Sequence, residues 1–221
     1  DMYLVWQKNI IDNWSELFQQ RKSFYFFVFN FLMSLSIYMI LVELLKLNSE
    51  SNGVVIRDPI QHFFVPRDFS TPIFLITYSC VFSFVLYIIQ YPRILHKGFH
   101  SFTFVFILRF LAIILMPLKP PADMILLVDR FVWGMTGGCV ITNDLFFSGH
   151  VSDICIFIFL TAYKPLKYML IVAVIVVAFL LVWQKVHYSM DVLCAPIFAF
   201  FAHYLFVEKQ YVRCLRLEEW V

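Results

Sequence analysis

The chain has 221 residues, of which 62% are apolar and 19% aromatic, while only 14% are charged. With a mean hydropathy of +0.80, this composition excludes an ordinary soluble domain and indicates a polytopic membrane protein. The formal net charge of +2 is too small for a nucleic-acid-binding surface, so we expect no nucleic-acid partner.

The N-terminal segment is amphipathic. Apolar residues such as Ile10, Ile11 and Trp14 recur among polar ones at a spacing closer to the helical than to the strand period. We therefore expect an interfacial amphipathic segment over residues 1–22, folded as a helix that lies along the membrane surface. The alternative is a frayed amphipathic tail.

Long apolar runs follow this segment, each close to the roughly 20 residues that cross about 30 Å of hydrocarbon as a helix. They are residues 24–46, 71–91, 101–117, 146–163, 166–183 and 187–207. We expect an all-α fold in which residues 23–208 form one membrane catalytic domain, a six-transmembrane-helix bundle. Residues 209–221 are expected to be a cytoplasmic tail.

The distribution of Lys and Arg predicts the orientation of these runs. Ten such residues fall on the side that holds the N-terminal segment and the C-terminal tail, and six fall on the other side. Positive charge accumulates on the cytoplasmic side of membrane proteins, so both termini are expected to be cytoplasmic. The opposite side is then lumenal or external, in the Golgi, the plasma membrane or a bacterial inner membrane.

The connection over residues 118–145 is long and contains Gly134, Gly137 and Gly138. Glycines allow sharp bends and close approach of the backbone to a ligand. We expect this connection to be a loop that covers a site on the outer side.

His187 and Asp191 lie at the head of the last apolar run, where an unpaired charge is expensive. Four residues apart, they would share one face of a helix. The carboxylate could orient one imidazole nitrogen and stabilise an imidazolium, which leaves the other nitrogen free to attack or to take a proton. The alternative is a purely structural His–Asp pair.

A second polar cluster, at the start of the fourth run, contains Asp144, Ser148, Gly149 and His150. A helix N-terminus there would offer backbone N–H groups to an anion, and Gly149 would let the backbone come close. His150 is then a candidate general acid and base, with Asp144 to orient it. Together the two clusters suit displacement at phosphorus without a metal or other cofactor. The alternative is a His–His–Asp metal site.

These clusters resemble two motifs of the sphingomyelin synthase family. Residues 143–150, NDLFFSGH, resemble its C-G-D-x-x-x-S-G-H-T motif, and residues 187–192, HYSMDV, resemble its H-Y-T-x-D-V motif. The segment from Asp58 to Arg67 and the stretch from Arg109 to Pro120 are similar to further parts of that family, and the resemblance covers about residues 55–205. The chain departs from the motifs in having Asn143, Val151 and Ser189 where the family has Gly, Thr and Thr.

The resemblance implies a six-span enzyme of the type 2 phosphatidate phosphatase superfamily. His187 would attack the phosphorus of a phospholipid donor with the help of Asp191, forming a phosphohistidine, while His150 protonates the departing diacylglycerol. His150 would then deprotonate a ceramide or similar lipid acceptor, which takes the head group. Asp58, Arg67 and Arg109 are expected to bind substrate. A homo-oligomer is left open.

Aromatic residues flank the predicted site and offer faces to a quaternary ammonium through cation–π attraction. They are Trp133, Phe146, Phe147, Trp183 and Tyr188, of which Trp133 and Tyr188 are the candidate substrate-binding residues. The alternative is the general enrichment of Trp and Tyr at membrane interfaces. Choline, ethanolamine and inositol all remain open as the head group.

Lipid phosphatases of the same superfamily carry a K-x6-R-P motif that holds a doubly charged phosphomonoester. The chain has no such motif, and the residues six and seven positions before His187 are Leu181 and Leu180. Few fixed positive charges favour a singly charged phosphodiester, and hence a transferase. A phosphatase or phospholipase C-type hydrolase is the alternative, and a non-catalytic lipid-binding protein is a second one.

Overall fold

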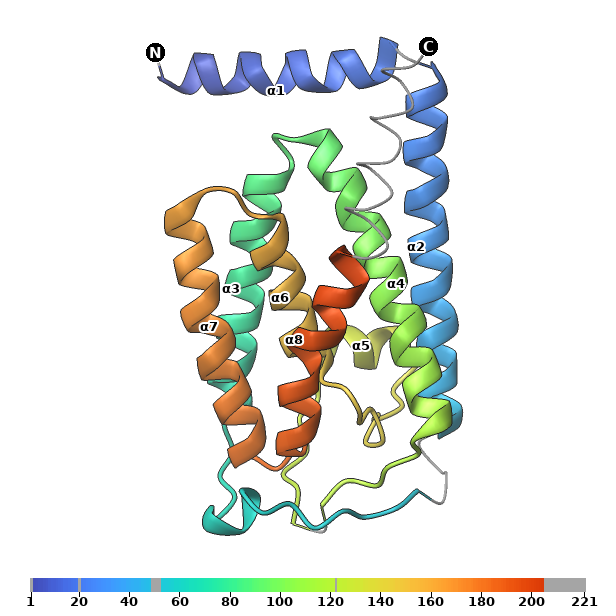
Figure 1. The fold of residues 1–221 in the computed structure, drawn as a ribbon, viewed down its shortest axis with the longest axis vertical. Coiled ribbons are helices and arrows are strands. Elements are labelled where there is room, and N and C mark those ends of the chain that lie inside the picture. The colour runs from blue at the N-terminus through green and yellow to red at the C-terminus, as the bar shows by residue number, and fades with distance from the viewer. Residues whose placement is uncertain (1, 20, 49–52, 122, 205–221) are drawn as a thin grey trace.

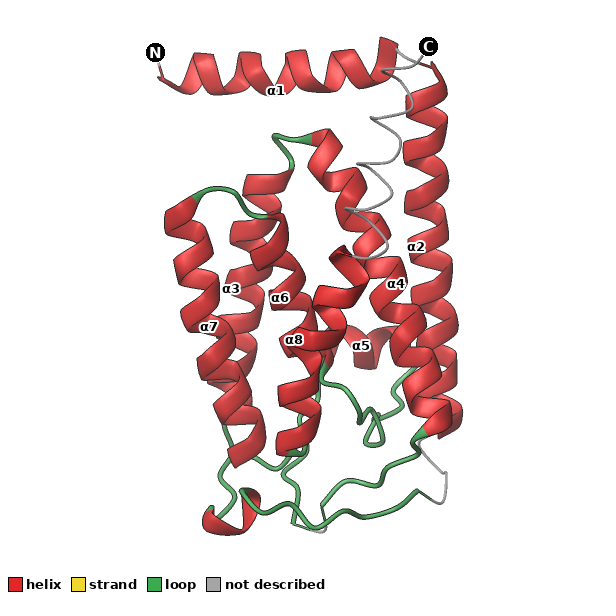
Figure 2. Ribbon diagram, in the orientation of Figure 1, coloured by secondary structure: helices red, strands yellow, loops and turns green. Residues whose placement is uncertain are grey.

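A computed structural model describes residues 2–19, 21–48, 53–121 and 123–204. Within these residues the chain forms α-helices, one 3-10 turn and no β strand, which confirms the all-α expectation (Figure 2). The elements are α1 (Met2–Gln19), α2 (Arg21–Asn48), η1 (Gln61–Phe63), α3 (Ser70–Ile88), α4 (Pro92–Leu115), α5 (Arg130–Met135), α6 (Gly149–Leu160), α7 (Lys164–Trp183) and α8 (Ser189–His203). The predicted tail, residues 209–221, lies outside the described residues.

Four of the described helices, α2, α3, α4 and α7, are long and apolar enough to cross a membrane. Helices α6 and α8 are apolar but have only 12 and 15 residues within the described part of the chain. At 1.5 Å per residue they are about 18 and 22 Å long, shorter than the roughly 30 Å of a hydrocarbon core. The structure therefore supports four spans where the sequence predicted six.

The start of α4 differs most from its predicted position, because the helix begins at Pro92 and the apolar run begins only at residue 101. Proline is favourable in the first turn of a helix, since its missing N–H would have no intrahelical partner there. His96, Lys97 and His100 lie in the next two turns and lower the local hydropathy. Hydropathy therefore detects only the apolar second part of this helix.

Helix α6 lies among α3, α4, α7 and α8, and apolar side chains on several of its sides belong to the main core (Figure 1). Ile154 and Ile156, on different sides of α6, are both completely buried. Phe157 stacks on Phe84 of α3 with ring centroids 4.3 Å apart. Helix α2 packs outside this core, against α4, through a separate cluster that contains Leu41, Leu45 and Ile113.

Helix α1 lies across one end of the bundle, roughly perpendicular to the other long helices (Figure 1). It is fixed to the α3–α4 turn, since Trp14 Nε1 donates to the Ile89 carbonyl at 2.8 Å and Asn13 Nδ2 to the Gln90 carbonyl at 2.9 Å. Glu16 also forms an ion pair of 2.6 Å with Arg93. The predicted N-terminal helix is present, and its place at a membrane surface stays a prediction.

The long connections gather at the opposite end of the bundle (Figure 1). Two of them join through their backbones, since the Val54 N–H donates to the Pro117 carbonyl at 2.9 Å and the Lys119 N–H to the Val54 carbonyl at 3.0 Å. A Cβ on Gly53 would lie 2.7 Å from the carbonyl carbon of Leu118, so this junction requires glycine. The connection over residues 118–145 is not a loop throughout, because it contains α5.

Candidate active site

A cavity of about 380 Å³ opens at this end of the bundle, bounded by α2 to α6 and by the connections before α5, α6 and α8. Its wall is mostly apolar, as in many small-molecule sites. The ionisable and hydroxyl-bearing side chains on the wall are Tyr38, Thr77, Tyr78, Arg109, Asp129, Cys139, Thr142, Asp144, His150, Asp153 and His187. The connection over residues 118–145 supplies much of the wall, and that it covers a functional site stays a prediction.

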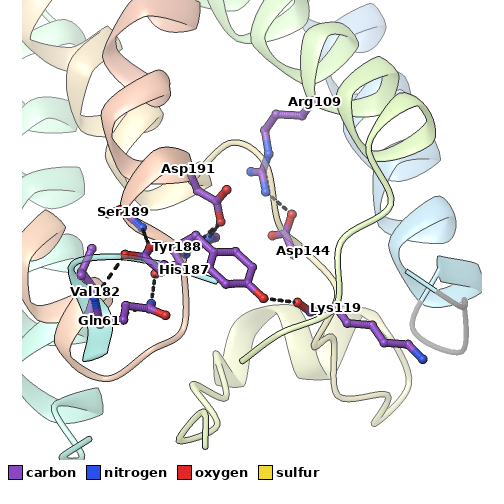
Figure 3. Close-up of polar contacts among 10 residues, drawn as sticks. Gln61, Arg109, Lys119, Asp144, Val182, His187, Tyr188, Ser189 and Asp191 are labelled. Atoms are coloured by element: carbon purple, nitrogen blue, oxygen red, sulfur yellow. Dashed lines mark hydrogen bonds and ion pairs between the residues drawn. The ribbon is translucent and has the colours of Figure 1, made fainter. Parts of the chain in front are cut away.

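His187 lies in the turn before α8 and not on the helix itself, which begins at Ser189. Its Nδ1 is 3.5 Å from Asp191 Oδ2, and its side chain is only 4% exposed. That oxygen also accepts a hydrogen bond of 3.0 Å from the Tyr188 backbone N–H, which caps the start of α8. His187 and Asp191 therefore lie next to each other, as the four-residue spacing predicted, although a capping turn and not a shared helix face brings them together (Figure 3). The predicted hydrogen bond is not made, because His187 Nδ1 is buried without a hydrogen-bond partner among the described residues.

The connection over residues 53–69 braces the His187 turn from outside. Asp58 Oδ2 accepts a hydrogen bond of 2.5 Å from the Ser189 N–H, and Asp58 Oδ1 accepts from the Ile60 and Gln61 N–H groups. Gln61 Nε2 in turn donates to the His187 carbonyl at 2.7 Å (Figure 3). Burial raises the pKa of the Asp58 carboxyl, but these hydrogen bonds lower it by more, so it lies below its ordinary value.

The Ser148–His150 segment forms the start of α6, with Ser148 as the N-cap residue. The Ser148 backbone N–H donates to the Asp191 carbonyl at 3.1 Å, so a main-chain hydrogen bond joins the two histidine segments. Ser148 Oγ is fully buried and makes no hydrogen bond with the described residues. His150 and His187 both line the cavity, so the structure brings the two predicted imidazoles to one site.

Arg109 reaches the site from the middle of α4 and forms an ion pair with Asp144 (Figure 3). Its guanidinium lies directly against Gly149, where a Cβ would be only 2.0 Å from Nη1. Burial raises the pKa of the Asp144 carboxyl, but the charge and hydrogen bond of Arg109 lower it by more, so Asp144 is held in its ionised form. Arg109 Nε is buried without a partner among the described residues.

Asp153 and Asp129 also line the cavity, and the sequence reasoning missed both. Asp153 lies three residues after His150 on α6, and its Oδ1 is buried without a hydrogen-bond partner among the described residues. Asp129 Oδ1 accepts a hydrogen bond of 2.8 Å from the Tyr78 hydroxyl. The spacing of Asp153 from His150, inside an apolar run, is a signal that could have been used, because residues i and i+3 share a helix face.

Three predicted substrate-binding residues do not line the cavity. Arg67 is exposed on the connection before α3, and Asp58 braces the backbone outside the wall. Tyr188 is buried, where its hydroxyl donates to the Lys119 carbonyl at 2.8 Å and accepts from the Ile56 N–H at 3.2 Å. In this structure Asp58 and Tyr188 therefore position the His187 turn, while Arg67 contributes nothing to the site.

The predicted group of aromatic residues is dispersed, and only Trp133 lines the cavity. Phe147 is buried and stacks on Phe198, with ring centroids 4.5 Å apart. Trp183 packs against Phe69 and donates its indole N–H to the Val65 carbonyl at 3.0 Å. The structure thus gives no aromatic cage made of the five predicted residues.

The cavity offers two imidazoles, one of them beside a buried carboxylate, and one guanidinium that is already paired. Such a set can supply a nucleophile, an acid and base, and a positive charge to a tetrahedral anionic centre. No group of three or more His, Cys, Asp or Glu side chains within the described ranges is arranged to hold a metal ion. Comparisons with models of protein families, with curated proteins and with solved structures give no match.

Proposed function

We propose that this chain is a membrane phosphotransferase that moves a phosphorylated head group from a glycerophospholipid to ceramide or a similar lipid alcohol. The observation that carries the proposal is that His150 and His187 line one cavity and that Asp191 Oδ2 lies 3.5 Å from His187 Nδ1. The motif resemblance to sphingomyelin synthases, carried by these same residues, supports the same reaction.

In the first step His187 Nε2 attacks phosphorus, because Nδ1 is turned toward Asp191. The bond between phosphorus and the diacylglycerol oxygen breaks, and the protonated His150 gives its proton to that oxygen. Asp191 stabilises the positive charge that develops on the His187 ring. The products of this step are diacylglycerol and a phosphohistidine.

In the second step the neutral His150 removes the proton from the acceptor hydroxyl, whose oxygen attacks phosphorus. The bond between phosphorus and His187 Nε2 breaks, and the head group leaves on the acceptor. Arg109 is the only Lys or Arg on the described cavity wall, and Asp144 neutralises it in the absence of substrate. A single paired guanidinium suits the one negative charge of a phosphodiester in both steps.

Hydrolysis on the same scaffold is the second candidate function, in which water replaces the lipid acceptor. The described cavity wall sets Asp129, Asp144 and Asp153 against Arg109. This excess of carboxylates disfavours the doubly charged phosphate of a phosphomonoester, and so speaks against a phosphatidate phosphatase.

For the membrane arrangement, we propose that α2, α3, α4, α6, α7 and α8 all cross the bilayer. The connections before the short helices α6 and α8 would complete their crossings, since irregular backbone is tolerated where it is buried in protein or lines a water-filled cavity. Helix α1 would lie along the cytoplasmic surface, in line with its perpendicular orientation (Figure 1). The cavity would then face the outer or lumenal leaflet.

The test of the reaction uses the purified chain in liposomes that contain phosphatidylcholine, phosphatidylethanolamine, ceramide and a metal chelator. We expect phosphosphingolipid and diacylglycerol to form in equal amounts, measured by mass spectrometry. Release of a water-soluble head group without transfer would establish a hydrolase instead.

The test of the mechanism is His187→Ala, which should lower turnover by about a thousandfold or more, because it removes the nucleophile. The matched control is His62→Ala, because His62 is an exposed histidine on η1 that lies outside the cavity. Thermal unfolding of both variants checks that the bundle is intact. Full turnover by a folded His187→Ala protein would rule out the phosphohistidine.

A further inference from the structure

The part of the cavity wall away from His187 has an unused hydrogen-bond acceptor. Asp153 lies one turn beyond His150 on α6, and its Oδ1 is buried with no donor among the described residues. Thr77 Oγ1, on α3, lines the same cavity and is likewise buried without a partner. A buried carboxylate oxygen left in this state is strongly unfavourable unless a donor from water or from a ligand pairs with it.

The nearest fixed cation does not satisfy Asp153. Arg109 forms its ion pair with Asp144, and its Nε makes no hydrogen bond with the described residues. Asp129 and Asp144 line the same cavity as Asp153, so three carboxylates and one guanidinium share its described wall. With a single guanidinium against three carboxylates, this region favours a positively charged guest.

We propose that this region, defined by Asp153 and Thr77, binds the primary ammonium of the donor head group. The inference rests on the proposed function and names its donor, a phospholipid with a phosphoethanolamine head group. The phosphate would lie between Arg109 and the two imidazoles. The two-carbon link would then carry the ammonium along α6, where the Cβ atoms of residues three apart are about 5–6 Å from each other.

Hydrogen bonding decides between a primary and a quaternary ammonium at this place. A primary ammonium carries three N–H donors, enough in number for both Asp153 Oδ1 and Thr77 Oγ1. A trimethylammonium has none and would leave the buried carboxylate oxygen without a partner. The described wall carries the aromatic side chains Tyr38, Tyr78, Phe106 and Trp133, whose faces attract any ammonium, but cation–π attraction does not give Asp153 Oδ1 a hydrogen-bond donor.

The test is a competition among donors with identical acyl chains. Full-length protein in liposomes receives equal amounts of phosphatidylethanolamine, phosphatidylcholine and phosphatidylinositol with ceramide, and mass spectrometry measures the products. We expect the ethanolamine product to exceed the choline product at least about tenfold, because a choline head group would leave one buried polar group without a hydrogen-bond partner. An equal or greater choline or inositol product from the wild-type protein would overturn the proposal.

Variants of Asp153 and Thr77 then test whether these two residues determine the preference for the ethanolamine head group. Asp153→Asn keeps the shape but removes the charge, so the ethanolamine-to-choline ratio should fall toward one. Thr77→Val, of nearly the same shape, should lower the ratio less and serves as a second variant should Asp153→Asn fail to fold. The control is Asp68→Asn, an exposed carboxylate at the start of α3, which should leave the ratio unchanged. An unchanged ratio in both cavity variants would refute the assignment.

A binding measurement separates this inference from the proposed reaction. Calorimetric titration of the wild-type protein with O-phosphoethanolamine, phosphocholine and inorganic phosphate needs no turnover. Preferential binding of O-phosphoethanolamine, weakened at least about tenfold by Asp153→Asn, would support the ammonium site even if no transfer is found. Equal affinity for the three probes, or no binding of any, would overturn the ammonium site while leaving the transfer assay to decide the reaction.

Discussion

Gly149→Ala is a stringent test of the Arg109 position, because the two residues are in direct contact. The added Cβ would lie 2.0 Å from Arg109 Nη1 and 2.8 Å from Cζ. Ordinary carbon contacts are about 3.5–4.0 Å, so the guanidinium would have to move by roughly 1.5 Å. The Arg109 side chain is 9% exposed and paired with Asp144, and both features restrict where it can go.

Two measurable effects follow from this clash. Overpacking of a buried site costs about 1–3 kcal/mol, which corresponds to a fall in Tm of about 2–12 °C for a chain of this size. A positioning group displaced by more than an ångström lowers turnover by about a hundredfold. We expect both changes when transfer rate and thermal unfolding are measured in the same preparation, with the assay temperature kept below the Tm of the variant.

The control is Gly134→Ala on α5, where an added Cβ would meet no atom within 4 Å. It should leave the rate unchanged and can raise stability slightly, because alanine is the better helix former. In an Arg109→Ala background Gly149→Ala should cost nothing further, since the atom it strikes is gone. A Gly149→Ala protein with wild-type rate and Tm would show that Arg109 does not occupy this position.

Two further predictions concern the frame around the site. The pKa of Asp58 is lowered in the folded chain, so its stabilising effect is complete above the ordinary value of 3.8 and is lost as the pH falls through the lower folded value. The Tm of the wild-type protein should therefore drop more steeply than that of Asp58→Asn in a pH series downward from about 5, and parallel curves would contradict the role of Asp58. Gln184→Leu leaves the Phe69 N–H, now bonded to Gln184 Oε1 at 2.8 Å, without its acceptor. The loss should be about 1–3 kcal/mol in equilibrium unfolding, and an unchanged unfolding free energy would mean that water replaces the amide.

Much of the helical framework could be predicted from the sequence, because long apolar runs have few other ways to satisfy their backbone groups. Hydropathy does not report helix ends, so it placed the start of α4 nine residues late and gave α6 more length than it has. The first turns of α4 contain polar residues that lower the mean hydropathy, so a hydropathy profile misses them. The start of α6 follows the N-cap residue Ser148, which hydropathy also does not detect.

Spacing predicted the His187 and Asp191 pair, because four residues of chain hold the two side chains together in a helix and in a capping turn alike. Spacing could not show that Asp58 accepts a hydrogen bond from the Ser189 N–H, since that contact joins segments 131 residues apart. It also could not show that the Tyr188 hydroxyl is used by the backbone and that Arg67 is turned outward. Contacts between segments that are far apart in the sequence can be identified only from the folded structure.

The hydrogen bond from the Ser148 N–H to the Asp191 carbonyl has a consequence for how such a site can change. Because a main-chain hydrogen bond joins the starts of α6 and α8, the relative position of these two backbone segments should change little when side chains around them are replaced. New substrates are more easily accommodated across the cavity, at α2, α3 and α5, whose side chains face it without a comparable main-chain link. Directed evolution of this chain should therefore accumulate its productive substitutions on that wall and leave the histidine segments unaltered.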